Sequence, residues 1–97
     1  MIPYDFHSEA EAEFAAAALF YESRLVGLGS SFVREVEQVV AFIRAHPDAG
    51  SPLGSKVRRV LVRRFPYSLI YRLEDERVYV LAVAHQRRRS GYWRRRT

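Results

Sequence analysis

Residues Lys56–Tyr71, with the sequence KVRRVLVRRFPYSLIY, are the segment from which the rest of the chain can be interpreted. Apolar side chains recur there at every second position, which is the spacing of a sheet with one buried face. The pattern predicts two adjacent strands, Lys56–Arg64 and Tyr67–Arg72, joined at Phe65-Pro66. The alternating apolar residues are Val60, Val62, Tyr67, Leu69 and Tyr71.

Four arginines alternate with the apolar positions of the first predicted strand. A guanidinium group suits bidentate contacts with phosphate, so a rigid strand that carries four of them indicates an anion-binding surface. Strand edges also carry solvated basic residues that prevent sheets from pairing with one another, and this segment is equally compatible with that interpretation. The four residues are Arg58, Arg59, Arg63 and Arg64.

The whole chain predicts an α+β fold with the element order β-α-α-β-β-β. Residues 2–7 form a short strand, residues 8–45 a helical hairpin, residues 56–85 a three-stranded meander, and residues 86–97 a basic tail. We expect a single domain in which the hairpin packs on one face of an antiparallel sheet. The strand arginines are then expected to gather on the other face.

The helical hairpin has its own local signals. Ser8 and Glu11 are spaced as a capping box at the start of a helix that runs to about Leu25. A second helix, from about Ser31 to Ala45, carries apolar residues at helical spacing. The last strand, at residues 79–85, is apolar almost throughout, which is typical of a central strand covered on both faces.

The composition excludes few classes of protein, but the charge is distributed unevenly along the chain. The 97 residues contain no cysteine and carry a net charge of +5. Residues 1–48 hold three arginines against eight acidic residues, a balance of −5, whereas residues 49–97 hold thirteen basic groups against three acidic ones, a balance of +10. A basic half of this kind attracts nucleic acid or an acidic protein.

The sequence indicates no membrane span, secretory signal, metal site or nucleotide-binding site. No apolar run reaches the length of about 18 residues that a membrane span needs, and the first residues do not resemble a secretory signal. We therefore expect a cytoplasmic protein. The histidines His7, His46 and His85 are scattered, and no nucleotide-binding glycine motif occurs. Neither a metal site nor a small-molecule cofactor is therefore predicted.

Three motifs together resemble a known family. They are FHSEAEAE at residues 6–13, RRFPYSLIY at residues 63–71 and VAHQRRRSGYW at residues 83–93. In combination they are similar to the RelE/ParE family of toxins from type II toxin–antitoxin pairs. The resemblance implies a curved antiparallel sheet with a helical hairpin, and a cognate antitoxin whose C-terminal segment wraps the toxin.

The resemblance leaves two activities open. ParE-like members inhibit DNA gyrase by binding to it, and the Gly-Tyr-Trp ending is closer to these or to unassigned members of the family. RelE-like members cleave messenger RNA on the ribosome without a metal, which requires an acid, a base and cations. For that alternative the resemblance assigns the scissile phosphate to Arg63 and the cleaved nucleotide to Tyr92, and His85 is a candidate acid or base. The residues expected to bind nucleic acid or a target are Arg59, Arg64, Arg87, Arg88, Arg89 and Trp93.

Overall fold

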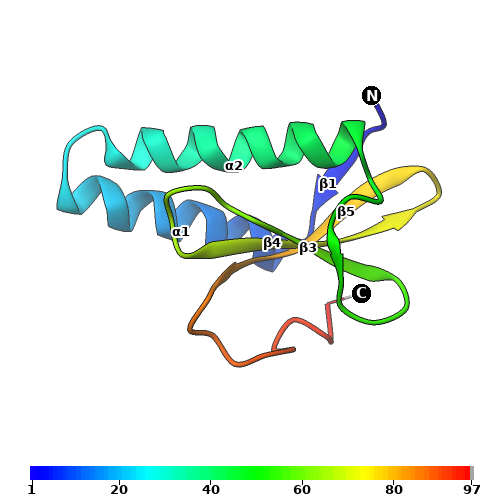
Figure 1. Cartoon of the computed structure of the whole chain (residues 1–97). Coiled ribbons are helices and arrows are strands. Elements are labelled where there is room, and N and C mark those ends of the chain that lie inside the picture. Colours follow the sequence, from blue (N-terminus) through cyan, green and yellow to red (C-terminus); the bar gives the residue numbers. More distant parts are fainter. Residues whose placement is uncertain (97) are drawn as a thin grey trace.

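The computed structural model describes residues 1–96 and consists of a helical hairpin packed on a five-stranded sheet (Figure 1). The strand order across the sheet is β1-β5-β4-β3-β2. The elements are β1 (Tyr4–Phe6), α1 (Ser8–Arg24), α2 (Leu28–Ala45), β2 (Ser51–Pro52), β3 (Val57–Leu61), β4 (Tyr67–Glu74) and β5 (Arg77–His85). No helix within residues 1–96 is both long and apolar enough to cross a bilayer.

The sheet is mixed, although we expected it to be antiparallel throughout. β3, β4 and β5 form the antiparallel meander that the alternating pattern predicts. β1, however, pairs with β5 in parallel, with Tyr4 opposite Val78 and Phe6 opposite Val80. The side-chain pattern of a three-residue strand is the same in either orientation, so its direction could not be inferred. β5 lies between β1 and β4 and is therefore an interior strand, as its apolar sequence predicts, although β1 flanks it only as far as Val80.

The link between β3 and β4 differs from the prediction in a way that matters for the arginines. β3 ends at Leu61, so Arg63 and Arg64 lie in the turn and not on the strand. Arg64 has φ +71°, a left-handed conformation that is uncommon for any residue other than glycine. Two of the four arginines predicted on a rigid strand are therefore on a connection instead.

The other boundaries shift by a few residues. β4 continues to Glu74 and β5 already begins at Arg77, because the turn between them contains only Asp75 and Glu76. Both of these have positive φ, 49° and 58°, as the tight turns favoured between twisted strands require.

The two helices are joined by a contact between α1 and the beginning of α2. Glu22 on α1 accepts hydrogen bonds from the backbone N–H groups of Gly27 and Gly29, both at 2.9 Å. These groups belong to the first turn of α2, where N–H donors lack partners within the helix. α2 consequently begins at Leu28, three residues before the predicted start at Ser31.

The first helix is capped by a residue other than the predicted one. His7 is the N-cap of α1, and its Nδ1 accepts a hydrogen bond from the Glu9 backbone N–H at 3.0 Å. Ser8 is already helical, so the predicted Ser8–Glu11 capping box is wrong. His7 can take this place because an unprotonated ring nitrogen accepts a hydrogen bond as a serine hydroxyl does.

The sheet is buried on both faces. On the helical side, Phe32, Val36, Ile43 and Leu69 belong to a core of fully buried side chains. On the opposite side a second cluster contains Ile70, Leu81, Ala82, Ala84 and Trp93. Because Trp93 belongs to the basic tail, the tail covers the face on which the strand arginines were expected to gather.

Candidate functional site beneath the C-terminal arch

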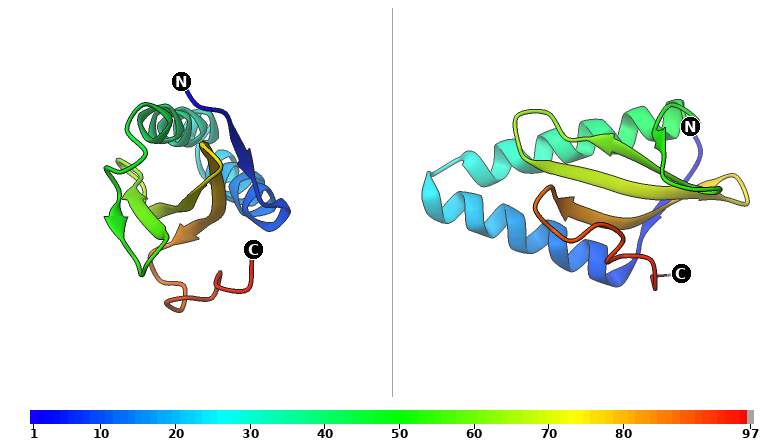
Figure 2. Two further views of the ribbon diagram at one scale, coloured as in Figure 1. Left: turned by 90° about the vertical axis from the view of Figure 1, so that its right-hand side faces the viewer. Right: turned by 60° about the horizontal axis from the view of Figure 1, so that its bottom comes forward.

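Residues 86–94, which we call the arch, cross the face of the sheet opposite the helices and bring the chain back toward the start of α1 (Figure 2). The sheet separates this segment from α2 in both views of Figure 2. The Gln86 backbone N–H donates to the Pro66 carbonyl at 2.8 Å, which fixes the arch where it leaves β5. At its far end Trp93 is only 6% exposed and packs in the cluster with Ile70 and Leu81, so its large aromatic ring fixes this end of the arch to the sheet.

Glu13 on α1 holds the end of the tail in place. Its carboxylate accepts a hydrogen bond from the Tyr92 hydroxyl at 2.7 Å. It also accepts two from the guanidinium of Arg96, at 2.9 Å and 3.0 Å. Bidentate, charge-assisted bonds of this kind are the strongest hydrogen bonds between side chains. We call Glu13, Tyr92 and Arg96 the Glu13 clamp.

The clamp also completes the outer edge of β5. β1 pairs with β5 only as far as Val80, so the following backbone groups lack a neighbouring strand. The Val83 N–H donates instead to Glu13 Oε1 at 3.0 Å, and the Leu81 carbonyl accepts from Arg96 Nη1 at 3.1 Å. Side chains from the helix and the tail therefore satisfy an edge that would otherwise be free to pair with another chain.

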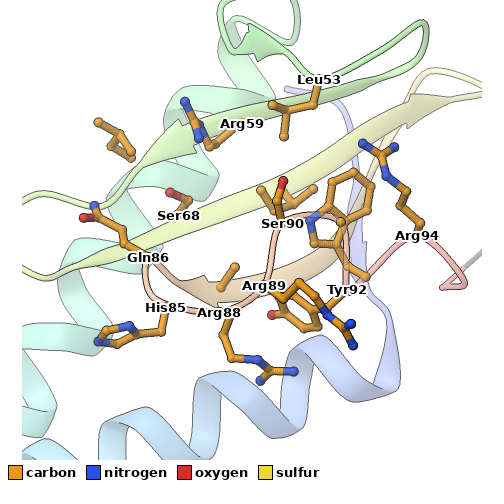
Figure 3. Close-up of a pocket in the computed structure, with 15 residues that line it drawn as sticks. Leu53, Arg59, Ser68, His85, Gln86, Arg88, Arg89, Ser90, Tyr92 and Arg94 are labelled. Atoms are coloured by element: carbon orange, nitrogen blue, oxygen red, sulfur yellow. The ribbon is translucent and has the colours of Figure 1, made fainter.

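A cavity of about 430 Å³ lies between the arch and the sheet (Figure 3). Its floor is apolar and includes Leu61, Ile70 and Ala84, and the hydroxyls of Ser68 and Ser90 also line it. Among residues 1–96, its lining includes four arginines and no acidic residue, so its electrostatic potential is positive. They are Arg59, Arg88, Arg89 and Arg94.

The Tyr92 hydroxyl is hydrogen-bonded within the Glu13 clamp. Burial raises the pKa of its hydroxyl well above the usual range, and the hydrogen bond donated to Glu13 raises that pKa further. The proton is thus held between the phenol oxygen and a carboxylate at physiological pH. In this position the hydroxyl is a structural donor and is not available to accept a proton from a substrate.

His85 is likewise engaged in a local structure. Its Nδ1 accepts a hydrogen bond from the Arg87 backbone N–H at 3.0 Å. The ring packs edge-on against Tyr67, with 5.0 Å between the ring centroids. Figure 3 shows the imidazole pointing away from Arg59 and Ser90, toward the edge of the cavity.

Arg63 and Arg64 lie outside the cavity. Arg63 lines a separate groove between α2 and β3, together with Glu35 and Phe42. Arg64 approaches Glu35 with 3.6 Å between the charged atoms. The three residues of the RelE-like assignment are therefore not brought together, since His85 and Tyr92 line one cavity and Arg63 lines another groove.

The residues expected to bind a target do not all lie in the cavity beneath the arch. Arg59, Arg88, Arg89 and Trp93 line the cavity, whereas Arg64 and Arg87 do not. Within residues 1–96, no group of three or more histidine, aspartate or glutamate side chains is arranged to hold a metal ion.

Sequence reasoning did not single out Glu13, Arg94 or Arg96 as site residues. For Glu13 a signal was present, because it falls between the buried positions Ala10 and Ala17 at helical spacing. A carboxylate on the buried stripe of a helix needs a partner of opposite charge. That partner, Arg96, is one of six arginines in the tail, and nothing in the local sequence distinguishes it from the others.

Residues 4–90 match the family model described as the ParE toxin of the type II toxin–antitoxin system parDE. The chain belongs to the ParE toxin family. It is therefore the toxin component of a type II toxin–antitoxin system, and membership in the ParE family implies an antitoxin partner. The resemblance inferred from the three sequence motifs is confirmed.

Solved structures place the fold within the same group of toxins. A chain of the chromosomal ParDE toxin–antitoxin system from P. aeruginosa is similar with a TM-score of 0.65 and 22% identity, over 88% of this chain and 96% of that one. The isolated E. coli RelE toxin is similar with a TM-score of 0.66 and 20% identity, over 98% of this chain and 95% of that one. No curated protein matches in sequence. At these identities the structural likeness concerns the fold alone.

Proposed function

We propose that this ParE-family chain acts in the cytoplasm as a ParE-like toxin, which inhibits DNA gyrase by binding to it and is neutralised by a cognate antitoxin. The observation that carries the proposal is the Glu13 clamp. It engages the Tyr92 hydroxyl in a structural hydrogen bond and leaves no free phenol at the position where a RelE-like mechanism would need one.

The positions of the other two candidate groups support the same conclusion. A metal-free cleavage of RNA needs an acid, a base and a cation around one phosphate. Here the Nδ1 atom of His85 is hydrogen-bonded to the backbone, and Arg63 lies in the groove beside α2. Binding to a protein target requires no such convergence, only a rigid surface of suitable charge and shape.

A ribosome-dependent endoribonuclease is the second candidate. It is favoured by the cavity beneath the arch, because four arginines beside Tyr92 and His85 offer cations for a phosphate. Under this candidate Arg63, His85 and Tyr92 have the catalytic roles, and the clamp has to open before cleavage. Opening the clamp in this way would break the bidentate contact between Arg96 and Glu13.

The deciding experiment combines a purified and a cellular assay. Purified chain should inhibit supercoiling by DNA gyrase, and His85→Gln should inhibit it equally because no proton transfer is involved. Expression without the antitoxin should cause filamentation and a DNA-damage response while translation continues. Intact gyrase activity, together with messenger RNA cut at codons in a manner abolished by Arg63→Ala, would establish the ribonuclease instead.

A further inference from the structure

We propose that Ser90 is a phosphorylation site for an arginine-directed serine kinase, and that arginines of the cavity hold the attached phosphate. The modification would regulate the charge of the cavity beneath the arch, whichever cellular target the chain inhibits. Three observations carry the proposal: the accessibility of the Ser90 hydroxyl, the arginines that precede it in the sequence and the arginines that surround it in the fold.

The Ser90 hydroxyl is accessible and has no structural role of its own. The side chain is exposed and lines the cavity, and Figure 3 shows it directed from the arch toward the strands. Within residues 1–96 its hydroxyl forms no hydrogen bond, and the N–H groups of residues 89–91 donate none to the backbone. This part of the arch can therefore open locally into the groove of a kinase with few bonds broken.

The sequence before Ser90 suits a kinase whose substrate groove is acidic. Residues 87–89 are three consecutive arginines, and all three are exposed. Among the serines and threonines of the chain, only Ser90 and Thr97 directly follow such a run. Arg96, however, is buried in the Glu13 clamp. The arginines before Ser90 are thus accessible to a kinase, whereas the run before Thr97 is not accessible throughout while the clamp is closed.

The reaction is the transfer of a phosphoryl group from ATP. The Ser90 Oγ attacks the γ-phosphorus and forms a new O–P bond, while the bond from that phosphorus to the bridging oxygen of ADP breaks. The kinase takes the hydroxyl proton, and ADP leaves with the electron pair of the broken bond. Ser68 also lines the cavity, but it is only 5% exposed and cannot reach a kinase in the folded chain.

The cavity supplies cations for the phosphate that results. Arg59 on β3 and Arg89 on the arch both line it, and neither forms an ion pair with an acidic side chain of residues 1–96. Arg94 lies beside the next residue along the chain, because a Cβ on Gly91 would be 2.7 Å from its Nε. A phosphoserine carries about two negative charges and forms charge-assisted hydrogen bonds with guanidinium groups.

Two consequences follow from a phosphate held in this way. Its charge offsets that of the surrounding arginines, so the cavity attracts other anions less strongly. Its oxygens also link the arch to β3 through Arg59, so the tail should be held more firmly than in the unmodified chain.

The first experiment identifies the acceptor. The purified full chain is incubated with ATP and the catalytic subunit of cyclic-AMP-dependent protein kinase, which selects serines preceded by arginines. We expect one phosphate per chain, located on Ser90 by mass spectrometry of its peptides. Ser90→Ala should abolish the labelling, whereas Ser55→Ala, which removes another exposed serine, should leave it unchanged.

The second experiment separates recognition by the kinase from retention of the phosphate. Arg87→Gln/Arg88→Gln should slow phosphorylation by about tenfold or more, because the kinase reads these charges. In the unchanged chain, phosphorylation should raise the midpoint of thermal unfolding by about 5 °C. Arg59→Gln should be phosphorylated at the normal rate but lose at least half of that rise, whereas Arg34→Gln, an exposed arginine on α2, should keep all of it.

Four results would overturn the inference. They are no phosphorylation of the folded chain, labelling of Thr97 as fast as Ser90, an unchanged thermal midpoint after phosphorylation, or an equal rise in Arg59→Gln and in the unchanged chain. None of these measurements involves gyrase or the ribosome. The proposed function therefore stands or falls separately, in the supercoiling and messenger RNA assays.

Discussion

Replacing Glu13 with glutamine should detach the tail from the rest of the molecule. The side chains of Glu13 and Arg96 are only 16% and 10% exposed, so the pair is largely removed from water. Glutamine keeps the size of the side chain and one acceptor oxygen, but it removes the counter-ion that bonds Arg96 directly. The only acidic partner left to Arg96 within residues 1–96 is then Glu9, whose side chain is 66% exposed and lies 3.8 Å away. Breaking a buried pair from one side costs about 3–5 kcal/mol, and we expect about 3 kcal/mol here because one acceptor remains.

Thermal unfolding of the purified chain measures this cost. For a domain of this size, 1 kcal/mol corresponds to a shift of about 4–8 °C, so the midpoint should fall by roughly 15 °C. Glu11→Gln is the matched control, because it removes an exposed charge from the same end of α1 and should cost less than about 1 kcal/mol.

A double-mutant cycle with Arg96→Met assigns the loss to the pair itself. The two substitutions should be non-additive by about 1–3 kcal/mol if Glu13 acts through Arg96. Trp93 fluorescence should also change at a lower denaturant concentration than the circular dichroism of the helices in Glu13→Gln, since the arch is then held less firmly than the hairpin. A Glu13→Gln variant as stable as Glu11→Gln would refute the clamp.

Three further outcomes follow from other contacts. Tyr71→Phe removes the bond donated to the Pro47 carbonyl at 2.7 Å and the one accepted from the Gly50 N–H at 3.2 Å, so urea unfolding should show a loss of about 1–3 kcal/mol. Gly29→Ala would place a methyl carbon 2.6 Å from the Ala18 carbonyl oxygen, and should cost about 1–3 kcal/mol where Ser30→Ala, which is exposed, changes little. The raised pKa of Tyr92 means that the unfolded chain loses this proton first as the pH rises. Stability should therefore be complete below about pH 10 and decline above it, more steeply than in Tyr92→Phe, and spectrophotometric titration of the tyrosines should show the same difference.

Much of the fold is visible in short-range patterns. The apolar stripe of α2 and the alternation in β4 each report which face of the element is buried, and both were predicted within a few residues. The order of the two helices and of strands β1, β3, β4 and β5, and the interior position of β5, followed from the same patterns. The end of β3 was misplaced because Arg63 continues the alternation of the strand while the backbone has already turned toward Pro66.

The candidate site depends on contacts that such patterns do not contain. The sequence predicted a binding surface made by arginines of the strand and by arginines and aromatic rings of the tail. Of these residues, Arg59, Arg88, Arg89 and Trp93 do line one cavity. The sequence did not indicate that Arg63 would face α2. The side to which a residue in a turn points is set by the backbone angles of that turn, which strand periodicity does not report.

The sequence alone was sufficient for the two helices and four of the five strands, for the uneven distribution of charge and for the family, but it did not predict the short strand β2. The tertiary structure decided the parallel direction of β1, the path of the tail and the assembly of the Glu13 clamp. Glu13 and Arg96 are 83 positions apart, and Arg96 differs from its neighbouring arginines only in what surrounds it after folding. Local periodicity reports the burial of a side chain, but the choice of its partner depends on how distant elements pack together.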